Sequence, residues 1–331
     1  MKTCRVAIAG FGGVGRTVGA MLLARRARYR QLYDMDVRLV AVCGSRAGLA
    51  DAAGLEAQHF AMLQAGLTGP DMLKGANVLI EAGPTDLHTG GPGLAYLRGA
   101  LGAGMDAVVI SKGALVHSGP ELRALARATG ARIKISGATA AALPTIDLLD
   151  HSLRGGTVLG LEGILNATTN YLLNAMMLRH VGFEEALTEA QAGGFAESDP
   201  RKDTQGWDTA CKLLILANFG LGADLTLDDM VVEGIEHLTQ SRIERWRGEG
   251  LTPRLVGHLR REDDGWHARV GIKTYRGDDA FAHVPGKTKA IRIVTDVMGE
   301  ILAMGGGPEP VATASAALKD LEHLLEHPRA V

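Results

Sequence analysis

The chain has 331 residues, of which 46% are hydrophobic and 22% are charged, and its formal net charge is −2. This length is sufficient for two domains with their own cores, and the balanced charge gives no reason to expect a nucleic acid or a membrane as partner. The N-terminus leads into an expected strand without the apolar core of a signal peptide, and no apolar run reaches membrane-spanning length. The sequence therefore predicts a cytoplasmic protein with no nucleic acid or membrane partner.

The first motif is a glycine-rich turn between an apolar strand, 5–9, and a helix, 17–24. The turn has the G-x-G-x-x-G spacing of dinucleotide-binding sites. In that motif the first glycine permits a tight turn, the second lets the backbone approach a pyrophosphate, and the third lets helix and strand pack closely. We therefore predict that the helix N-terminus and this turn bind a dinucleotide. The residues of the turn are Gly10, Phe11, Gly12, Gly13, Val14 and Gly15.

The second strand, 37–43, should end beside the adenosine ribose, where a carboxylate would bind the ribose hydroxyls of NAD. Here the chain continues with Gly44, Ser45 and Arg46. A hydroxyl and a guanidinium suit a 2′-phosphate, so we predict NADP as the preferred cofactor, with NAD as the alternative. The other interpretation of Arg46 is a solvated arginine in a loop.

Further apolar strands alternate with helices in the first half of the chain. This rhythm predicts an α/β fold with right-handed crossovers and a Rossmann-like, doubly wound parallel sheet. Ligands of such sheets bind at the carboxyl ends of the strands. The strands are expected at 77–82, 106–110 and 132–135, and the helices at 92–102 and 121–129.

The loops that follow these strands carry polar residues to the same edge of the sheet. They include Pro84 and Thr85 after one strand, and Ser111 and Lys112 after the next. We expect Pro84, Thr85 and Ser111 to contact the cofactor and Lys112 to lie near its nicotinamide. A surface lysine is the alternative interpretation of Lys112.

The rhythm changes near residue 137, where a second, α+β domain begins. Its antiparallel part includes the segments 254–260 and 267–274, which flank a turn at Asp263-Asp264-Gly265 and are typical of a hairpin. A final helix, 311–326, is expected to return to the first domain. The predicted domains are 1–136 for the dinucleotide, 137–304 for the substrate, and 305–331 for the returning helix. Other expected elements are a helix at 144–152, a strand at 157–165 and a polar corner at 166–171 that opens a helix.

The most informative segment runs from Glu197 to Lys212 and enters an apolar helix, 207–219, whose only charges are Asp208 and Lys212. Residues four apart share a helical face, and this helix is expected to be buried almost all round. A buried ion pair commonly costs as much as it returns, so we predict a functional role for this pair. The alternative is an exposed pair that stabilises the helix by about 0.2–0.5 kcal/mol.

The three cysteines, Cys4, Cys43 and Cys211, lie in two expected strands and one expected helix. Their spacing matches neither a disulfide framework nor a zinc site, and the histidines are scattered. We predict three buried thiols and no metal.

On these motifs the chain resembles the homoserine dehydrogenases over nearly its whole length, in the short form without a C-terminal regulatory domain. The segment around Glu197 is the most selective part of the match. The resemblance implies NAD(P)-linked interconversion of L-homoserine and L-aspartate 4-semialdehyde, in the route to threonine and methionine, and a homodimer formed through the second domain. The matching segments are 10–15, 84–85, 111–113, 142–144, 163–171, 196–212, 313–314 and Asp320.

The resemblance also implies roles for individual residues. Lys212 is the first candidate for the general base and Lys112 the second, since a lysine in a dry site can have its pKa lowered enough to serve. Asp208 would bind the substrate hydroxyl or orient Lys212. The remaining expected substrate contacts are Glu197, Asp203, Thr168 and Ala167, and further cofactor contacts are Gly307 and Thr313. The alternative for Asp203 or Thr204 is a helix cap worth about 1 kcal/mol.

Three positions depart from the family pattern, which has Gly, Asn and Tyr where this chain has Ala167, Ser111 and Phe195. The hinge at Ser136 also lacks the carboxylate that accompanies a monovalent cation in many members. Two alternatives therefore remain open at this point. One is a related dehydrogenase for a different small hydroxy or amino acid, and the other is a nucleotide-binding sensor without turnover.

Overall fold

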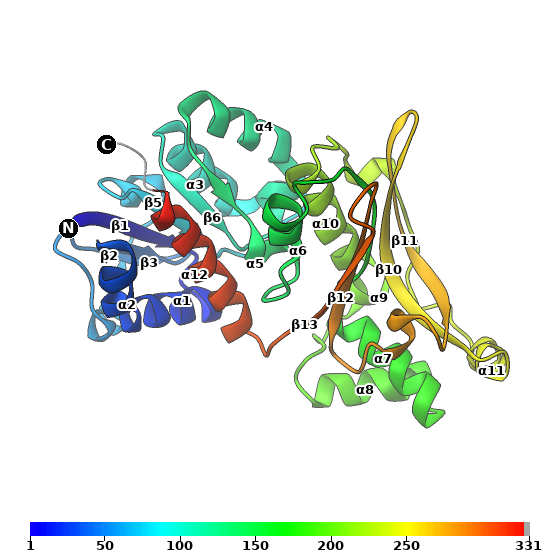
Figure 1. Cartoon of the computed structure of the whole chain (residues 1–331). Helices are drawn as coiled ribbons and strands as arrows, with labels where there is room; N and C mark the ends of the chain where they lie inside the picture. The colour runs from blue at the N-terminus through cyan, green and yellow to red at the C-terminus, as the bar shows by residue number, and fades with distance from the viewer. Residues whose placement is uncertain (328–331) are drawn as a thin grey trace. The chain divides into compact units, whose positions relative to one another are not determined.

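The computed structural model describes residues 1–327. The described chain divides into two compact units: Met1–Ala142 together with the segment from Gly307 onward form the first, and Leu143–Gly306 form the second. Figure 1 traces the chain from the first unit through the second and back into the first at α12 (Val311–Glu326). The sequence places the corresponding boundaries after residues 136 and 304.

The first unit is built on a seven-stranded sheet in the order β4-β3-β2-β1-β5-β6-β7. The strands β2, β1, β5, β6 and β7 pair in parallel, which confirms the predicted doubly wound parallel sheet. The strands β3 and β4, at one side of the sheet, pair antiparallel and were not predicted. The strands are β1 Lys2–Ala9, β2 Met35–Cys43, β3 Ala47–Ala50, β4 Gln64–Ala65, β5 Val78–Glu81, β6 Asp106–Val109 and β7 Ile133–Lys134.

Helices cover this sheet and bury their apolar faces in its core. Leu318 and Leu321 of α12 are fully buried and belong to the same core cluster as Val6 and Ile8 of β1. The helix α4 begins eight residues earlier than the sequence predicts, because it continues across a kink at Ser118 (φ −133°) that precedes Pro120. The other helices are α1 Gly13–Ala24, α2 Arg26–Tyr33, η1 Ala57–Ala61, η2 Pro70–Leu73, α3 Gly91–Gly102, α4 Gly113–Thr129 and α5 Ser136–Thr139.

The second unit contains a six-stranded sheet in the order β13-β12-β8-β10-β11-β9. Its longest strands, β10 and β11, form the predicted hairpin, in which Glu262 pairs with Gly265 across the turn. Every pairing is antiparallel except that of β9 with β11. The strands are β8 Val158–Ile164, β9 Met230–Val232, β10 Leu251–Glu262, β11 Gly265–Arg276, β12 Lys289–Thr295 and β13 Glu300–Gly305.

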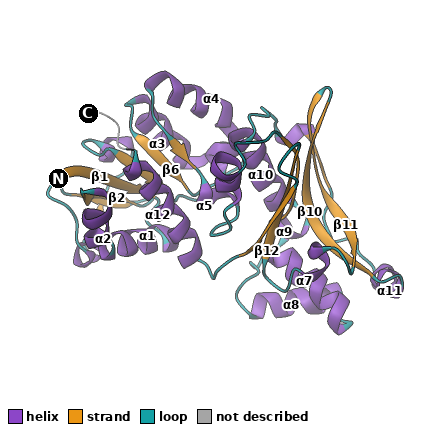
Figure 2. Cartoon of the chain, in the orientation of Figure 1, coloured by secondary structure: helices purple, strands orange, loops and turns teal. Residues whose placement is uncertain are grey.

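Helices α7 and α10 pack against β10 of this sheet (Figure 2). At Gly257 a Cβ atom would lie 3.3 Å from side-chain atoms of Leu213 and Thr209, so the absence of a side chain lets α10 approach the strand closely. The expected helix 207–219 is α-helical to Ile215 and ends in a π-helical turn. The elements are α6 Thr145–Asp147, η3 Leu148–Ser152, α7 Ala167–Arg179, α8 Phe183–Ala192, α9 Arg201–Thr204, α10 Trp207–Ile215, η4 Leu216–Gly220, η5 Leu227–Asp229, α11 Gln240–Gly248 and η6 Ala280–His283.

All three cysteines are buried free thiols, as predicted. Burial raises the pKa of the Cys4 thiol to about 12, so it stays protonated at neutral pH. Among the described residues, no helix combines the length and the apolar character needed to span a bilayer.

Candidate active site

The glycine-rich turn after β1 has the geometry that its spacing predicts. Gly10 adopts a positive φ of 91°, and a Cβ atom there would lie 2.3 Å from backbone atoms of Ala82 and Gly83. A Cβ atom on Gly15 would lie 2.1 Å from the carbonyl oxygen of Gly10. By contrast, a Cβ atom on Gly12 would meet nothing within 4 Å. Gly10 and Gly15 therefore close the turn, while the backbone of Gly12 faces open space.

The N-terminus of α1 leaves its first N–H groups open to an anion. The helix begins at Gly13, its N-cap Gly12 offers no side-chain cap, and its first turn contains no acidic residue. Beside it, the Phe11 ring packs edge-on against Phe60 at 4.9 Å, and Arg16 lies 5.0 Å above the Phe11 ring. Val14 packs against the core of the sheet. An open glycine backbone at the positive end of a helix fits the pyrophosphate of a dinucleotide.

The open space beside Gly12 can be tested by substitution. Gly12→Ala is expected to fold normally, because its backbone angles suit any residue and the new methyl group meets no protein atom. The methyl group would occupy the space a pyrophosphate needs, so the dissociation constant for a dinucleotide should rise about tenfold, or about 1.4 kcal/mol. Fluorescence titration and thermal denaturation measure the two quantities. Gly102→Ala in α3, which also meets open space, is the control, and an unchanged affinity in Gly12→Ala would contradict the prediction.

The turn after β2 contains both residues of the predicted adenosine-ribose contact. Ser45 and Arg46 are exposed in a turn closed by a 2.8 Å hydrogen bond from the Gly44 N–H to the Ala47 carbonyl. The turn holds no carboxylate, so both side chains are available to a phosphate.

The loops after β5 and β6 lie against each other, as expected for neighbouring parallel strands. The Lys112 N–H donates to Thr85 Oγ1 at 3.4 Å. A Cβ atom on Gly113 would lie 2.4 Å from the Asp86 carbonyl oxygen, so the loop that contains Pro84 packs against the start of α4. The structure thus brings Pro84, Thr85, Ser111 and Lys112 together at the carboxyl edge of the sheet.

The two residues expected from the returning segment differ in their surroundings. Gly307 is exposed at the start of that segment. Thr313 is only 4% exposed and lies in the first turn of α12, which packs against α1. Neither has a hydrogen bond that joins it to the glycine-rich turn.

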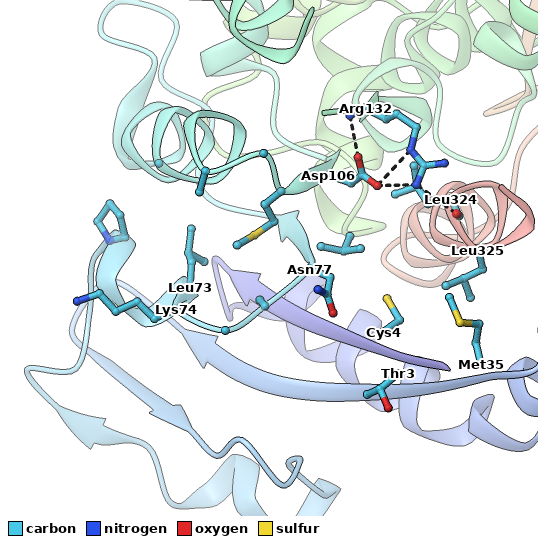
Figure 3. Close-up of a pocket in the computed structure, with 18 residues that line it drawn as sticks. Thr3, Cys4, Met35, Leu73, Lys74, Asn77, Asp106, Arg132, Leu324 and Leu325 are labelled. Carbon is cyan, nitrogen blue, oxygen red and sulfur yellow. Dashed lines mark hydrogen bonds and ion pairs between the residues drawn. The ribbon is translucent and has the colours of Figure 1, made fainter. Parts of the chain in front are cut away.

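A pocket of about 630 Å³ lies at the other end of the same sheet (Figure 3). Its lining includes Cys4 of β1, Asn77 just before β5, Asp106 at the start of β6, and Leu324 of α12. These positions mark the amino ends of the strands, opposite the glycine-rich turn. The pocket is therefore separate from the predicted dinucleotide site.

In the second unit the structure brings Asp208 and Lys212 into direct contact. Lys212 Nζ lies 2.5 Å from Asp208 Oδ2 and donates a second hydrogen bond, 2.8 Å long, to the Leu165 carbonyl. The side chains of Lys212 and Asp208 are only 11% and 14% exposed. The interpretation as an exposed surface pair is therefore wrong, and the pair lies in surroundings that screen charge weakly.

Asn166, which the sequence did not single out, is the centre of this cluster. Its side-chain amide Nδ2 donates to Asp203 Oδ1 and to Asp208 Oδ2, both at 2.8 Å. Its Oδ1 accepts from the Thr169 N–H at 2.8 Å and so caps α7. The available sequence signal was an N-capping residue type immediately before the predicted helix.

Asp203 completes the cluster, which includes two carboxylates and one ammonium group. Burial, followed by repulsion from Asp208, raises the pKa of Asp203, while hydrogen bonds from Thr168 and Asn166 and the charge of Lys212 oppose that rise. The alternative role as a cap is wrong for both residues: α10 has Gly206 as its N-cap without a side-chain cap, and Thr204 donates instead to Glu236 and Pro200. The cluster is defined here as Asn166, Asp203, Asp208 and Lys212.

The raised pKa of Asp203 predicts a pH-dependent effect on stability. The folded state binds this proton more tightly than the unfolded state, so the contribution of Asp203 to stability falls as pH rises from about 4, its ordinary value, through the raised pKa. Asp203→Asn removes the titration. The stability of the variant relative to the original protein should therefore be higher at pH 7 than at pH 4. Denaturant unfolding at pH 4 and at pH 7 measures the free energy of unfolding of both proteins. If the variant and the original protein differ by the same amount at the two pH values, the prediction is contradicted.

The other predicted substrate residues lie around this cluster to different degrees. Thr168 is 4% exposed, and its hydroxyl donates to the Phe195 carbonyl at 3.3 Å. Ala167 is half-buried at the first position of α7. Glu197 is exposed in the loop between α8 and α9, and within residues 1–327 its carboxylate makes no hydrogen bond or ion pair. The structure therefore connects Thr168 to the cluster and does not connect Glu197.

Comparison with known proteins identifies relatives for both units. A family model described as homoserine dehydrogenase matches residues 144–321, and one described as the NAD binding domain of homoserine dehydrogenase matches residues 10–136. An NAD(+)-dependent homoserine dehydrogenase of Pseudomonas canavaninivorans is 33% identical over 98% of this chain and 97% of its own. A homoserine dehydrogenase of Methanocaldococcus jannaschii is 30% identical over 96% and 98% of the two chains.

Solved structures agree with this result. The crystal structure of a putative homoserine dehydrogenase from Archaeoglobus fulgidus has a TM-score of 0.89 at 29% identity and covers 97% of this chain and 99% of that chain. A homoserine dehydrogenase from Thiobacillus denitrificans has a TM-score of 0.88 at 26% identity and covers 100% and 76%. The chain therefore belongs to the homoserine dehydrogenase family, the NAD(P)-dependent oxidoreductases that interconvert L-homoserine and L-aspartate 4-semialdehyde.

Proposed function

We propose that Lys212 is the general base that takes the hydroxyl proton when L-homoserine is oxidised, and the acid that returns it in reverse. The observation that supports this role most strongly is the buried contact of Lys212 with Asp208, in which the lysine also donates to the Leu165 carbonyl. Asp208 holds the amino group of Lys212 in place through this contact. Bound nicotinamide dinucleotide supplies the hydride acceptor or donor. Lys112 is the second candidate for the base, on the evidence of its position after β6.

We propose that the acidic side of this cluster receives the substrate. Asp203 accepts a hydrogen bond from the same Asn166 amide as Asp208, and it can also accept from the ammonium or hydroxyl group of an amino acid. Glu197 supplies a second carboxylate from its exposed loop. Thr168 and Ala167, at the start of α7, provide a small, weakly polar surface for the substrate chain.

We propose NADP as the preferred cofactor. The support comes from Ser45 and Arg46, which offer a hydroxyl and a guanidinium where NAD enzymes have a carboxylate. The Pseudomonas canavaninivorans relative is named as NAD(+)-dependent, so NAD is the alternative cofactor. The remaining contacts come from the turn Gly10–Gly15, from Pro84, Thr85 and Ser111, and from Gly307 and Thr313.

We propose that the protein acts in the cytoplasm as a homodimer formed through the sheet of the second unit. Val294 of β12 and Leu302 and Met304 of β13 are exposed apolar side chains, and the strand register places them on one face of the sheet. Contiguous exposed apolar side chains commonly mark an interface. Light scattering coupled to gel filtration measures the mass in solution.

The test of the function is the initial rate of NADP reduction, and separately of NAD reduction, with L-homoserine at mildly alkaline pH. We expect homoserine-dependent turnover with a higher kcat/KM for NADP. Arg46→Ala should lower kcat/KM for NADP by about tenfold, equivalent to about 1.4 kcal/mol, and change the value for NAD little. Lys74→Ala, at the opposite edge of the sheet, is the control. A preference for NAD that Arg46→Ala leaves unchanged would overturn the cofactor proposal.

No turnover of L-homoserine with either cofactor, by protein that binds one of them, would overturn the substrate. Chain-length analogues of L-homoserine assayed in the same experiment would then identify a different hydroxy amino acid. Binding without turnover of any of them would indicate a sensor.

A further inference from the structure

Glu81, the last residue of β5, is a carboxylate with no exposed surface. Its Oε1 accepts from the Gly83 N–H at 2.7 Å, and its Oε2 accepts from the Ser111 hydroxyl at 2.6 Å. Its carbonyl oxygen accepts from the Ile110 N–H at 2.8 Å, which continues the pairing of β5 with β6. The side chain therefore joins the residues that begin two neighbouring loops.

This carboxylate has no cationic partner within residues 1–327, in contrast to Asp36 and Asp106, two other buried acids of the same sheet. Asp106 at the start of β6 pairs with Arg132 at 2.5 Å. Glu81 instead packs against the first turn of α3, where a Cβ atom on Gly93 would lie 2.6 Å from Oε1. The positive ends of helices and backbone N–H groups can stabilise such an anion without a cation.

Keeping an acid in this position is costly for the fold. Burial is the main cause that raises the pKa of Glu81, and the hydrogen bonds from Ser111 and Gly83 oppose it. An apolar residue would fill a buried strand end without a desolvation penalty. The carboxylate at this position is therefore better explained by its hydrogen bonds to Gly83 and Ser111 than by a contribution to the stability of the fold.

The loops that Glu81 joins are those of the predicted cofactor edge. Gly83 lies against the glycine-rich turn, since a Cβ atom on Gly10 would be 2.3 Å from the Gly83 nitrogen. Ser111 immediately precedes Lys112, whose N–H donates to Thr85. The loops after β5 and β6 therefore meet at this carboxylate, and the loop after β1 packs against Gly83.

We infer that Glu81 is a positioning residue of the dinucleotide site, which holds the loops after β5 and β6 so that Pro84, Thr85 and Lys112 face the cofactor in one fixed arrangement. The inference rests on the proposed function only in assigning the cofactor to this edge. Glu81 acts through its hydrogen bonds with Gly83 and Ser111, and its own side chain contacts neither substrate nor cofactor.

The test combines Glu81→Ala, Glu81→Gln and Ser111→Ala with direct binding of NADPH and NADH, followed by fluorescence. We expect Glu81→Ala to raise the dissociation constant about tenfold and to lower kcat. Glu81→Gln should restore much of the binding, because its carbonyl oxygen can accept from Gly83 while its amide donates to the Ser111 oxygen. The effects of Glu81→Ala and Ser111→Ala should be clearly non-additive, since both remove the same contact.

Asp106→Asn is the matched control, because it alters a buried acid at the opposite edge of the same sheet. It should lower the Tm and leave dinucleotide binding unchanged. If Glu81→Ala fails to fold, Ser111→Ala decides the question, because it removes the same contact. Folded Glu81→Ala with unchanged affinity and kcat, Ser111→Ala with unchanged affinity, or additive effects of the two substitutions would overturn the inference. Because binding is measured without substrate, a failure to oxidise L-homoserine would overturn the proposed function alone.

Discussion

Lys212→Ala is expected to lower kcat by about 10²- to 10⁴-fold, the contribution typical of a positioned general base or acid. Dinucleotide affinity should stay unchanged, because Lys212 belongs to the second unit and the glycine-rich turn to the first. Asp208 keeps a hydrogen bond from Asn166 in the variant, which limits the loss of stability. Steady-state kinetics with L-homoserine, together with fluorescence titration of the dinucleotide, measure both effects.

A matched lysine in the same unit provides the control for Lys212→Ala. Lys273 of β11 also contacts a buried carboxylate, that of Glu162, at 2.5 Å. Lys273→Ala should lower the Tm without a comparable loss of kcat. If Lys212→Ala keeps a nearly normal kcat while Lys112→Ala loses activity, the base is Lys112.

Asn166→Asp is expected to lower kcat/KM at neutral pH by about 100-fold or more, comparable to the loss of a key electrostatic contact in an enzyme site. The substitution replaces the N–H group that joins Asp203 and Asp208 with a third carboxylate. The fold should persist, since aspartate caps a helix as well as asparagine does. The pH profile of kcat/KM and thermal denaturation measure these outcomes.

The pH profile distinguishes this role of Asn166 from a structural one. Repulsion among three carboxylates raises their pKa values, so activity of Asn166→Asp should recover in part as pH falls and one of them takes up a proton. Asn166→Ala should instead lose about 1 kcal/mol of stability from the missing cap. If Asn166→Asp has a normal kcat/KM across the pH range, the hydrogen bonds from Asn166 to Asp203 and Asp208 are not needed for activity.

The sequence predicted elements well where a pattern determines the structure by itself. The final helix has the predicted limits, 311–326, because its apolar period is regular and Pro310 precedes it. The β10–β11 hairpin follows from Asp263-Asp264-Gly265 between two alternating segments. The helix that carries Asp208 and Lys212 was likewise evident from its apolar surroundings.

Other features depend on tertiary contacts that a single sequence does not carry. Strands β3 and β4 are short, and they join the sheet through the pairing of β3 with β2. The sequence predicted a helix from residue 121, but α4 begins at Gly113 and continues across the kink at Ser118. Asn166 and Glu81 read as ordinary residues at an element boundary, and their importance comes from partners 37 and 30 positions away.

The hydrogen bonds of Lys212 to Asp208 and the Leu165 carbonyl allow its amino group to lose or gain a proton without changing partners. An ammonium group has three N–H bonds, and those to Asp208 and the Leu165 carbonyl account for two. A neutral amine still has two N–H bonds, so it can keep both partners after it gives up the third proton. Its lone pair then takes the direction that the lost proton had. In the proposed mechanism the side chain therefore alternates between acid and base without moving, because its two hydrogen-bond partners hold it in place.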